Sequence, residues 1–280
     1  MNNLKISFIY KPSFKYLEHS DNVKDIQELL SGFGYDIGNA GVDGIYGKDT
    51  KAALNEFIEI GRIKKGGSIN EKILLALTES NNQLEGFKPL SWENGHNSRQ
   101  EWSKFVFSTI DKLFNESFAI CEDITVFRRD YESLNRNQKI NVWGELISAI
   151  SYYESGWDPT SRMIETSMET DPVTGSQVAS EGLLQLSYQD GKSYSGKLKV
   201  ECKFDWNKDK PLFQKNPKNP NITILNPYFN LEFGIGILAY QIKNYRKIIL
   251  SKNVYWAVIK ENGKYEKINK IIDFVERLKL

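Results

Sequence analysis

The stretch 141-NVWGELISAISYYESGW-157 decides the fold of the larger part of this chain. Its apolar residues recur with the spacing of one helix face, at Trp143, Leu146, Ile147 and Ile150. Glu154 follows four positions after Ile150, on or beside the stripe that should face the core. The segment 155-SGW-157 then predicts the end of the helix. The pattern therefore predicts a core helix that carries an acid in its last turn.

The position of Glu154 allows two interpretations. In the first, partial burial and the negative end of the helix dipole both disfavour the carboxylate, so the pKa rises toward neutrality. An acid that keeps its proton near neutral pH can protonate a glycosidic oxygen. In the second, the side chain bends into water and has no special role. Spacing alone leaves both open.

Two segments further along the chain bear on this choice. The stretch 180-SEGLLQLS-187 contains Gly182, which permits close backbone approach, and Gln185, whose amide can hydrogen-bond a sugar hydroxyl or acetamido group. The stretch 226-NPYFNL-231 predicts a helix start, because proline suits the first position of a helix. The helix continues through the apolar residues Leu231, Ile235, Leu238 and Ile242.

The order Glu-Ser-Gly at 154–156, Gly-Leu-Leu-Gln at 182–185 and Asn-Pro-x-x-Asn-Leu at 226–231 resembles the soluble lytic transglycosylase family and its goose-type lysozyme relatives. The resemblance covers roughly residues 100–280 and implies a mainly α, lysozyme-like domain with a groove across it. It implies that Glu154 is the catalytic acid and base. In that family one glutamate cleaves the MurNAc–GlcNAc β-1,4 bond and leaves a 1,6-anhydro sugar. The substrate-binding residues that it implies include Gln185, Gly182, Leu183 and Ser155.

The family's tyrosine element, Ala-Tyr-Asn-x-Gly, is absent from this sequence. The nearest substitutes are Ala239-Tyr240-Gln241 and Tyr255-Trp256-Ala257, and we expect Tyr240 to contact substrate. The acidic insert 163–178, which contains Glu165, is either a solvated loop or a wall of the groove.

A hydrolytic muramidase of the same fold is the alternative activity. An inverting hydrolase needs a second carboxylate roughly 6.5–9.5 Å from the acid, and Glu181 or Asp190 is the candidate. A wall-binding protein that keeps the fold without catalysis is the alternative from another class.

The first part of the chain predicts a small three-helix bundle. Helices are expected from Ser20 or Asp21, from Asp49 or Thr50, and near residues 68–77. The run 43-DGIYG-47, with Thr50, Ala53-Leu54 and Phe57, resembles the peptidoglycan-binding domain type 1 family, although Ile58 stands where that family usually has glutamine. We therefore expect a peptidoglycan-binding domain at 1–80 with its core at about 20–79, a linker at 81–100 and the lysozyme-like domain at 101–280.

Composition excludes several classes of function. With 37 Lys+Arg against 36 Asp+Glu in 280 residues, the net charge of +1 argues against a dedicated nucleic-acid binder. Two His and two Cys, never in ligand spacing, argue against a zinc site or a Ser-His-Asp triad, so we expect no metal and no cofactor. The two cysteines are either idle thiols or a Cys121–Cys202 bridge.

The expected partner is the glycan strand of peptidoglycan, bound by a monomer without membrane insertion. The sequence has no stretch of eighteen apolar residues and no recognisable signal peptide. We therefore expect synthesis in the cytoplasm and action on the wall after release or delivery, as an endolysin or a secreted effector.

Overall fold

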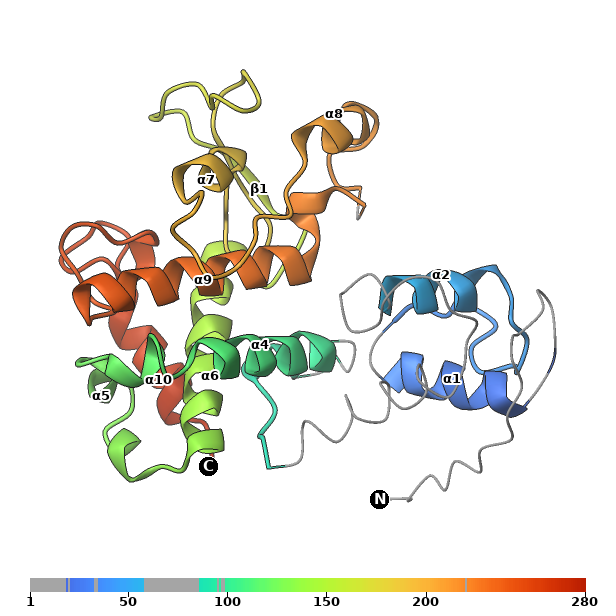
Figure 1. Ribbon diagram of the computed structural model, residues 1–280, viewed down its shortest axis with the longest axis horizontal. Coiled ribbons are helices and arrows are strands. Elements are labelled where there is room, and N and C mark those ends of the chain that lie inside the picture. The colour runs from blue at the N-terminus through green and yellow to red at the C-terminus, as the bar shows by residue number, and fades with distance from the viewer. Residues whose placement is uncertain are drawn as a thin grey trace. The chain divides into compact units, whose positions relative to one another are not determined.

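The computed structural model describes residues 19, 21–32, 35–57, 86–94, 96, 99–219 and 221–280. They fall into two compact units: one reaches Gly86 and includes Glu93–Lys104, and the other consists of Phe87–Trp92 and Phe105–Leu280. Helices make up most of the regular structure among these residues (Figure 1), so the predicted mainly α fold class is confirmed. The third helix predicted near residues 68–77 lies outside the described residues.

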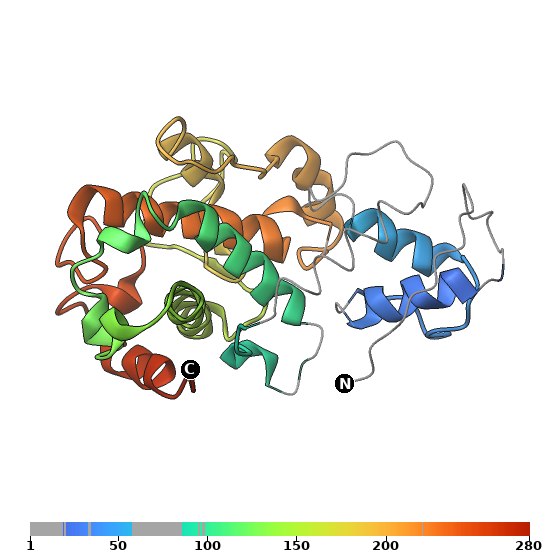
Figure 2. The ribbon, with the colours of Figure 1, turned by 60° about the horizontal axis from the view of Figure 1, so that its bottom comes forward.

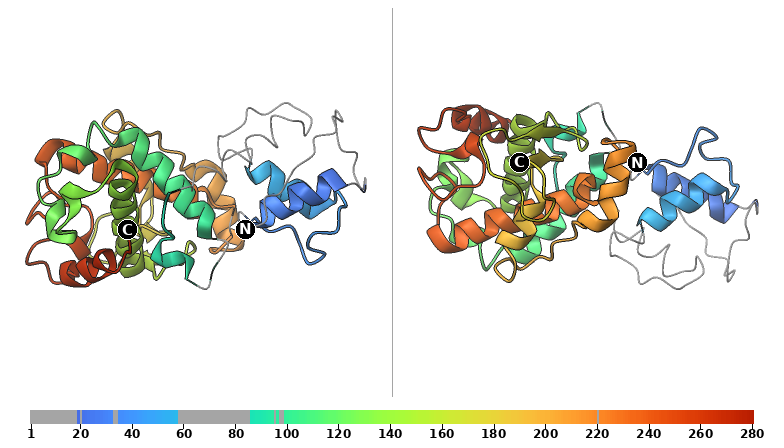
Figure 3. Two further views of the ribbon diagram at one scale, coloured as in Figure 1. Left: turned by 90° about the horizontal axis from the view of Figure 1, so that it is seen from below. Right: turned by 90° about the horizontal axis from the view of Figure 1, so that it is seen from above.

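The N-terminal unit contains two described helices, α1 (Asp21–Gly32) and α2 (Lys48–Phe57). They pack against each other (Figure 3), as the apolar periodicity predicts. The buried residues at this contact include Val23, Ile26, Leu30, Ala53 and Leu54. α1 begins at the predicted residue, whereas α2 begins at Lys48, just before the predicted start.

Gln27 organises the turn between these helices, and the sequence analysis did not identify it. The side chain is 1% exposed, and its Oε1 accepts from the Gly44 N–H at 2.7 Å. Its Nε2 donates to Asp43 Oδ1 at 2.8 Å, to Thr50 Oγ1 at 2.8 Å and to the Ile45 carbonyl at 3.2 Å. The residues of the Asp-Gly-Ile-Tyr-Gly-x-x-Thr motif therefore have a folding role: they supply the hydrogen-bond partners of the buried Gln27 side chain.

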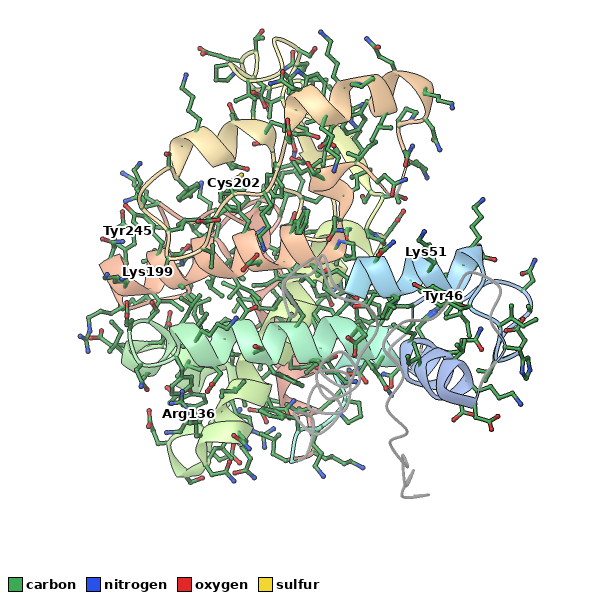
Figure 4. The ribbon with its side chains drawn as sticks, turned by 45° about the vertical axis from the view of Figure 1, so that its right-hand side comes forward. Tyr46, Lys51, Arg136, Lys199, Cys202 and Tyr245 are labelled. Carbon is green, nitrogen blue, oxygen red and sulfur yellow. The ribbon has the colours of Figure 1, made fainter. Side chains whose placement is uncertain are left out.

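Gln27→Ala is expected to destabilise the N-terminal unit by about 2–4 kcal/mol, because it leaves several buried polar groups without partners. A unit of this size has little stability to lose. Amide hydrogen exchange on the full chain should show lost protection in residues 21–57. Lys51→Ala, at an exposed position of α2 (Figure 4), is the control and should change protection little. Unchanged protection in the Gln27 variant would contradict this account.

The second unit is built around α6 (Arg136–Ser155), α9 (Pro227–Tyr245) and the part of α4 (Gln100–Leu113) that follows Lys104. Figure 1 shows α7 (Tyr188–Ser193), α8 (Trp206–Lys215) and a short hairpin on one side of α9. The hairpin pairs β1 (Arg162–Ile164) with β2 (Ala179–Glu181), with Met163 opposite Ser180. The remaining short elements of the described chain are α5 (Ile124–Phe127), α10 (Ile268–Glu276) and the 3₁₀ turns η2 (Ser91–Glu93), η4 (Phe118–Ile120), η5 (Tyr131–Ser133), η6 (Thr223–Leu225) and η7 (Ala257–Ile259).

α6 is the central helix of this unit. Asn135 and Gln138 form a capping box at its start, so the helix begins earlier than the expected cap at Asn141. Every residue from Ile140 to Ser151 is buried, and the helix therefore lacks the single apolar face that the spacing suggested. The reason is that neighbours surround it: α10 packs along it (Figure 2), and Phe107 of α4 lies where a side chain on Gly144 would be.

An ion pair and the segment Phe87–Trp92 also contact α6. Arg136, at the start of the helix (Figure 4), pairs with Asp111 of α4 at 2.8 Å. Residues Phe87–Trp92, which fall within the predicted linker, belong to the second unit. The backbone of Lys88 donates to Asn141 Oδ1 at 2.6 Å, and the Ser91 N–H donates to Glu145 Oε2 at 3.0 Å. This part of the predicted linker is therefore held on α6 by two buried polar side chains.

Candidate active site

Glu154 lies in the last turn of α6 and points one carboxyl oxygen into the protein. Its Oε1 is fully enclosed and has no hydrogen-bond partner among the described residues, whereas Oε2 is not enclosed in this way. Burial, with a smaller contribution from the negative charge of Glu165, raises the pKa of Glu154 to about 7. Glu154 is therefore half protonated near neutral pH, with one oxygen facing inward and the other available to a ligand.

The end of α6 is held by contacts that fix the position of Glu154. Ser155 Oγ donates to the Ser151 carbonyl at 3.0 Å and to the Leu183 carbonyl at 2.9 Å, which joins the helix end to the segment 180–187. Gly156 has a φ of 63° and ends the helix in the left-handed conformation. Trp157 also has a φ of 63°, a strained value for a residue with a Cβ, and its Nε1 donates to the Ser148 carbonyl at 2.8 Å.

The segment 180–187 forms a tight loop beside this helix end. Gln185 has a φ of 48°, and its Nε2 donates to the Gly182 carbonyl at 2.8 Å and to the Ser161 carbonyl at 3.4 Å. Its amide therefore shapes the loop. Leu183 is fully buried, so its side chain belongs to the core, and its carbonyl accepts from Ser155 Oγ.

Asn230 of α9 holds this loop from behind, and the sequence analysis did not single it out as a site residue. Its Oδ1 accepts from the Leu184 N–H at 2.8 Å, and its Nδ2 donates to the carbonyls of Glu181 and Ile224 at 3.0 Å each. Gly182 has a φ of 76°, and a Cβ there would lie 2.4 Å from Asn230 Nδ2. The Asn-Pro-x-x-Asn-Leu motif thus meets the Gly-Leu-Leu-Gln motif through one buried amide.

The two carboxylates predicted as alternatives for a second acid already have protein partners. Glu181 Oε1 pairs with Arg162 Nε at 2.7 Å across the hairpin, and burial raises the pKa of Glu181 to about 7. Asp190 Oδ2 accepts from the N–H and Oγ of Ser187, at 2.7 and 2.9 Å, and from Tyr255 OH at 2.5 Å. Burial raises the pKa of Asp190 above its usual range. Each carboxylate therefore has one oxygen bonded within the protein, Glu181 Oε1 and Asp190 Oδ2, while Glu181 Oε2 is buried without a hydrogen-bond partner among the described residues.

Glu165 is the carboxylate whose charge acts on Glu154. It follows β1 directly, its N–H donates to the Val178 carbonyl at 2.8 Å, and its Oε1 accepts from Ser180 Oγ at 2.5 Å. Of the two interpretations of the insert 163–178, the structure therefore favours the wall of the site for this residue. Its place in the chain, directly after the first strand that follows α6, does not by itself distinguish it from the other acidic residues.

Tyr255, rather than Tyr240, is the tyrosine that interacts with Glu154. Burial raises the pKa of Tyr255 above its usual range, and the charges of Asp190 and Glu154 act in the same direction. Tyr240 packs edge-on against Tyr194, with ring centroids 5.9 Å apart. The ring centroids of Tyr194 and Tyr255 are 6.4 Å apart. The ring of Tyr194 thus links Tyr240 to Tyr255, and the contact of Tyr240 with substrate stays a prediction.

Other predicted features can be located as well. Cys121 and Cys202 are both free thiols, so the bridge considered from the sequence is not formed. Within the described ranges, no group of three or more His, Cys, Asp or Glu side chains is placed to hold a metal ion. None of the helices in the described part of the chain is long and apolar enough to cross a membrane.

Comparisons with known proteins bear on each unit. A family model described as a peptidoglycan binding domain matches residues 19–57. This match supports a peptidoglycan-binding domain within the N-terminal unit. The type VI secretion system spike protein VgrG3 of Vibrio cholerae is 44% identical over 45 residues, which are 16% of this chain and 4% of that protein. This chain therefore spans only a small part of the length of that relative.

Solved structures of DslA share the fold of this chain. The wild-type structure matches with a TM-score of 0.52 and 24% identity, covering 68% of this chain and 96% of that one. Two variants of DslA, each with a glutamate replaced by glutamine, match with TM-scores of 0.51 and 0.52 at the same identity and each cover 95% of their own length. The likeness establishes the fold, and the comparisons together indicate a function related to the cell wall.

Proposed function

We propose that this protein binds peptidoglycan through residues 1–80 and cleaves its glycan strands in the domain 101–280, with the segment 81–100 between them. The observation that supports this most is Glu154, an acid with a raised pKa at a strained helix end, beside a second carboxylate on Glu165. Binding to the wall keeps the glycan at high local concentration around the catalytic domain. The target is the β-1,4 bond between MurNAc and GlcNAc.

Two routes begin with the same step. Glu154 gives its proton to the glycosidic oxygen as the bond from that oxygen to C1 breaks. In a lytic transglycosylase, the C6 hydroxyl of the muramyl unit then attacks C1. Glu154, now ionised, accepts the proton of that hydroxyl. In a hydrolase, water attacks C1 and a second carboxylate accepts the proton of that water. The sequence resemblance favours the first route.

Glu165 supports the hydrolytic route. It is the carboxylate that acts on Glu154, while Glu181 and Asp190 are engaged by Arg162 and Tyr255. The glutamates changed in the two DslA variants are eleven positions apart, and Glu154 and Glu165 of this chain have the same separation. We therefore propose Glu165 as the residue that activates water, and retain transglycosylation as the second candidate.

Product analysis tests the proposal. Purified peptidoglycan is digested in water labelled with ¹⁸O, and the muropeptides are weighed. We expect new reducing ends that carry one ¹⁸O atom. Anhydro ends without label would instead support transglycosylation. If the protein sediments with peptidoglycan but produces no new glycan ends, it is a binding protein without catalysis, and the proposed activity is wrong.

The route to the wall is also a proposal. The match to a spike protein of the type VI secretion system supports delivery as a secreted effector. Release as an endolysin remains the second route that we consider. Peptidoglycan is the partner in either case, and we propose that the protein acts on it as a monomer.

A further inference from the structure

Two buried serines stand behind Glu154 on its own helix. Ser148 and Ser151 are both fully buried, and neither Oγ has a hydrogen-bond partner among the described residues. The same is true of Glu154 Oε1, the enclosed oxygen of the acid. Buried hydroxyl and carboxyl oxygens are nearly always hydrogen-bonded, to protein or to ordered water. Three such atoms on one helix therefore indicate a shared ligand.

The spacing on α6 brings these three groups together. Residues three apart on a helix are neighbours on its surface, so Ser151 lies next to both Ser148 and Glu154. The backbone carbonyls of the two serines already have side-chain partners: Trp157 Nε1 donates to the Ser148 carbonyl, and Ser155 Oγ donates to the Ser151 carbonyl. The serine hydroxyls are the polar groups on this side of the helix whose hydrogen bonds remain to be made.

We infer that Ser148 and Ser151 bind an internal water molecule that hydrogen-bonds to Oε1 of Glu154. The chemistry of the site fits water, because a bound water needs two to four polar partners and these three oxygens supply them. A water that donates to Oε1 leaves the proton of the acid on Oε2, the oxygen that is not enclosed. Ser151 is then a positioning residue: it acts on the reaction through the water and through Glu154.

This inference rests on the proposed function for its catalytic meaning, but its test does not. The titration of Glu154 can be followed by carbon NMR of the carboxyl group without substrate, with Glu154→Gln identifying the signal. Glu165 is the titratable group whose charge acts on Glu154, and the charge of Glu154 in turn acts on Tyr255; both residues are unchanged in the variants below.

Ser151→Ala is expected to raise the midpoint of the Glu154 titration by roughly half to one pH unit, because the ionised carboxylate loses a hydrogen-bond donor. Ser148→Ala should raise it by less. Thr109→Val is the matched control, since it also removes a buried hydroxyl, one that donates to the Phe105 carbonyl of its own helix at 2.8 Å. That variant should leave the midpoint unchanged. An unchanged midpoint in Ser151→Ala would overturn the inference.

A crystal structure of the unchanged protein gives a second measurement that does not depend on a variant folding. We expect density for a water within about 3 Å of both Ser151 Oγ and Glu154 Oε1. Clear density that shows the two serines bonded only to their own helix carbonyls would also overturn the inference. If the water and the shifted midpoint are found while the unchanged protein cleaves no glycan, the proposed function fails and the water site stands.

Discussion

Replacing Glu154 with glutamine is expected to lower the rate of glycan cleavage about 10³-fold, because the amide occupies the same space but cannot donate an acidic proton. The loss should appear in kcat, since the acid acts in the transition state and the rest of the site is unchanged. Release of soluble muropeptides from purified peptidoglycan measures the rate. Undiminished release by the Glu154 variant would contradict the assignment of the acid.

The same variant has a stability signature that separates loss of chemistry from loss of folding. Burial raises the pKa of Glu154 to about 7, so the stability associated with its protonated form is lost as the pH rises through that value. Glutamine removes this penalty. Glu154→Gln should therefore be more stable than the unchanged protein at pH 8, by roughly 1–3 kcal/mol, and equally stable near pH 4. Sedimentation with peptidoglycan should be unaffected.

Asn230→Ala is expected to destabilise the second unit by about 3–5 kcal/mol, the largest effect on folding that we anticipate. The substitution removes the side-chain partner of the Leu184 N–H and of the Ile224 carbonyl, and one of the two donors to the Glu181 carbonyl, which also accepts from the Leu186 N–H. It also removes the support of the loop that carries Gln185, so activity should fall with stability. Calorimetry of the full chain should show the midpoint of the larger transition lowered by roughly 10 °C.

Asn244→Ala is the matched control for this prediction. Asn244 lies on the same helix but is exposed, and its side chain donates only to the Tyr240 carbonyl one turn earlier, at 2.7 Å. Its replacement should change the free energy of unfolding by less than about 0.5 kcal/mol. If both asparagine variants lower the midpoint equally, Asn230 is not the specific support of the loop that we describe.

Local patterns in the sequence were sufficient for the main helices and for the position of Glu154. Apolar spacing located α6 and α9, and the same spacing placed Glu154 at the helix end, because the positions of residues along one helix follow from covalent geometry. The Asp-Gly-Ile-Tyr-Gly run likewise identified the N-terminal unit, which a family model now matches over residues 19–57. Each of these features depends on residues that are close in the chain.

The partners of the acid required the tertiary structure. Glu165, Glu181 and Asp190 are all acidic residues downstream of α6, and nothing in their sequence positions ranks them. Only the folded chain shows that Arg162 pairs with Glu181, that Tyr255 donates to Asp190, and that the charge of Glu165 acts on Glu154. Gln27 and Asn230 escaped notice for the same reason, since each joins segments that lie far apart in sequence.

The sequence alone determined that this chain is mainly helical, that it begins with a peptidoglycan-binding motif and that one glutamate ends its central helix. The tertiary structure decided which oxygen of that glutamate is enclosed, which carboxylate and tyrosine act on it, and which amide holds the neighbouring loop. The physical reason is that periodicity and capping are set by residues a few positions apart. The pKa of an acid depends on its burial and on nearby charges, and both are set by residues that only folding brings together.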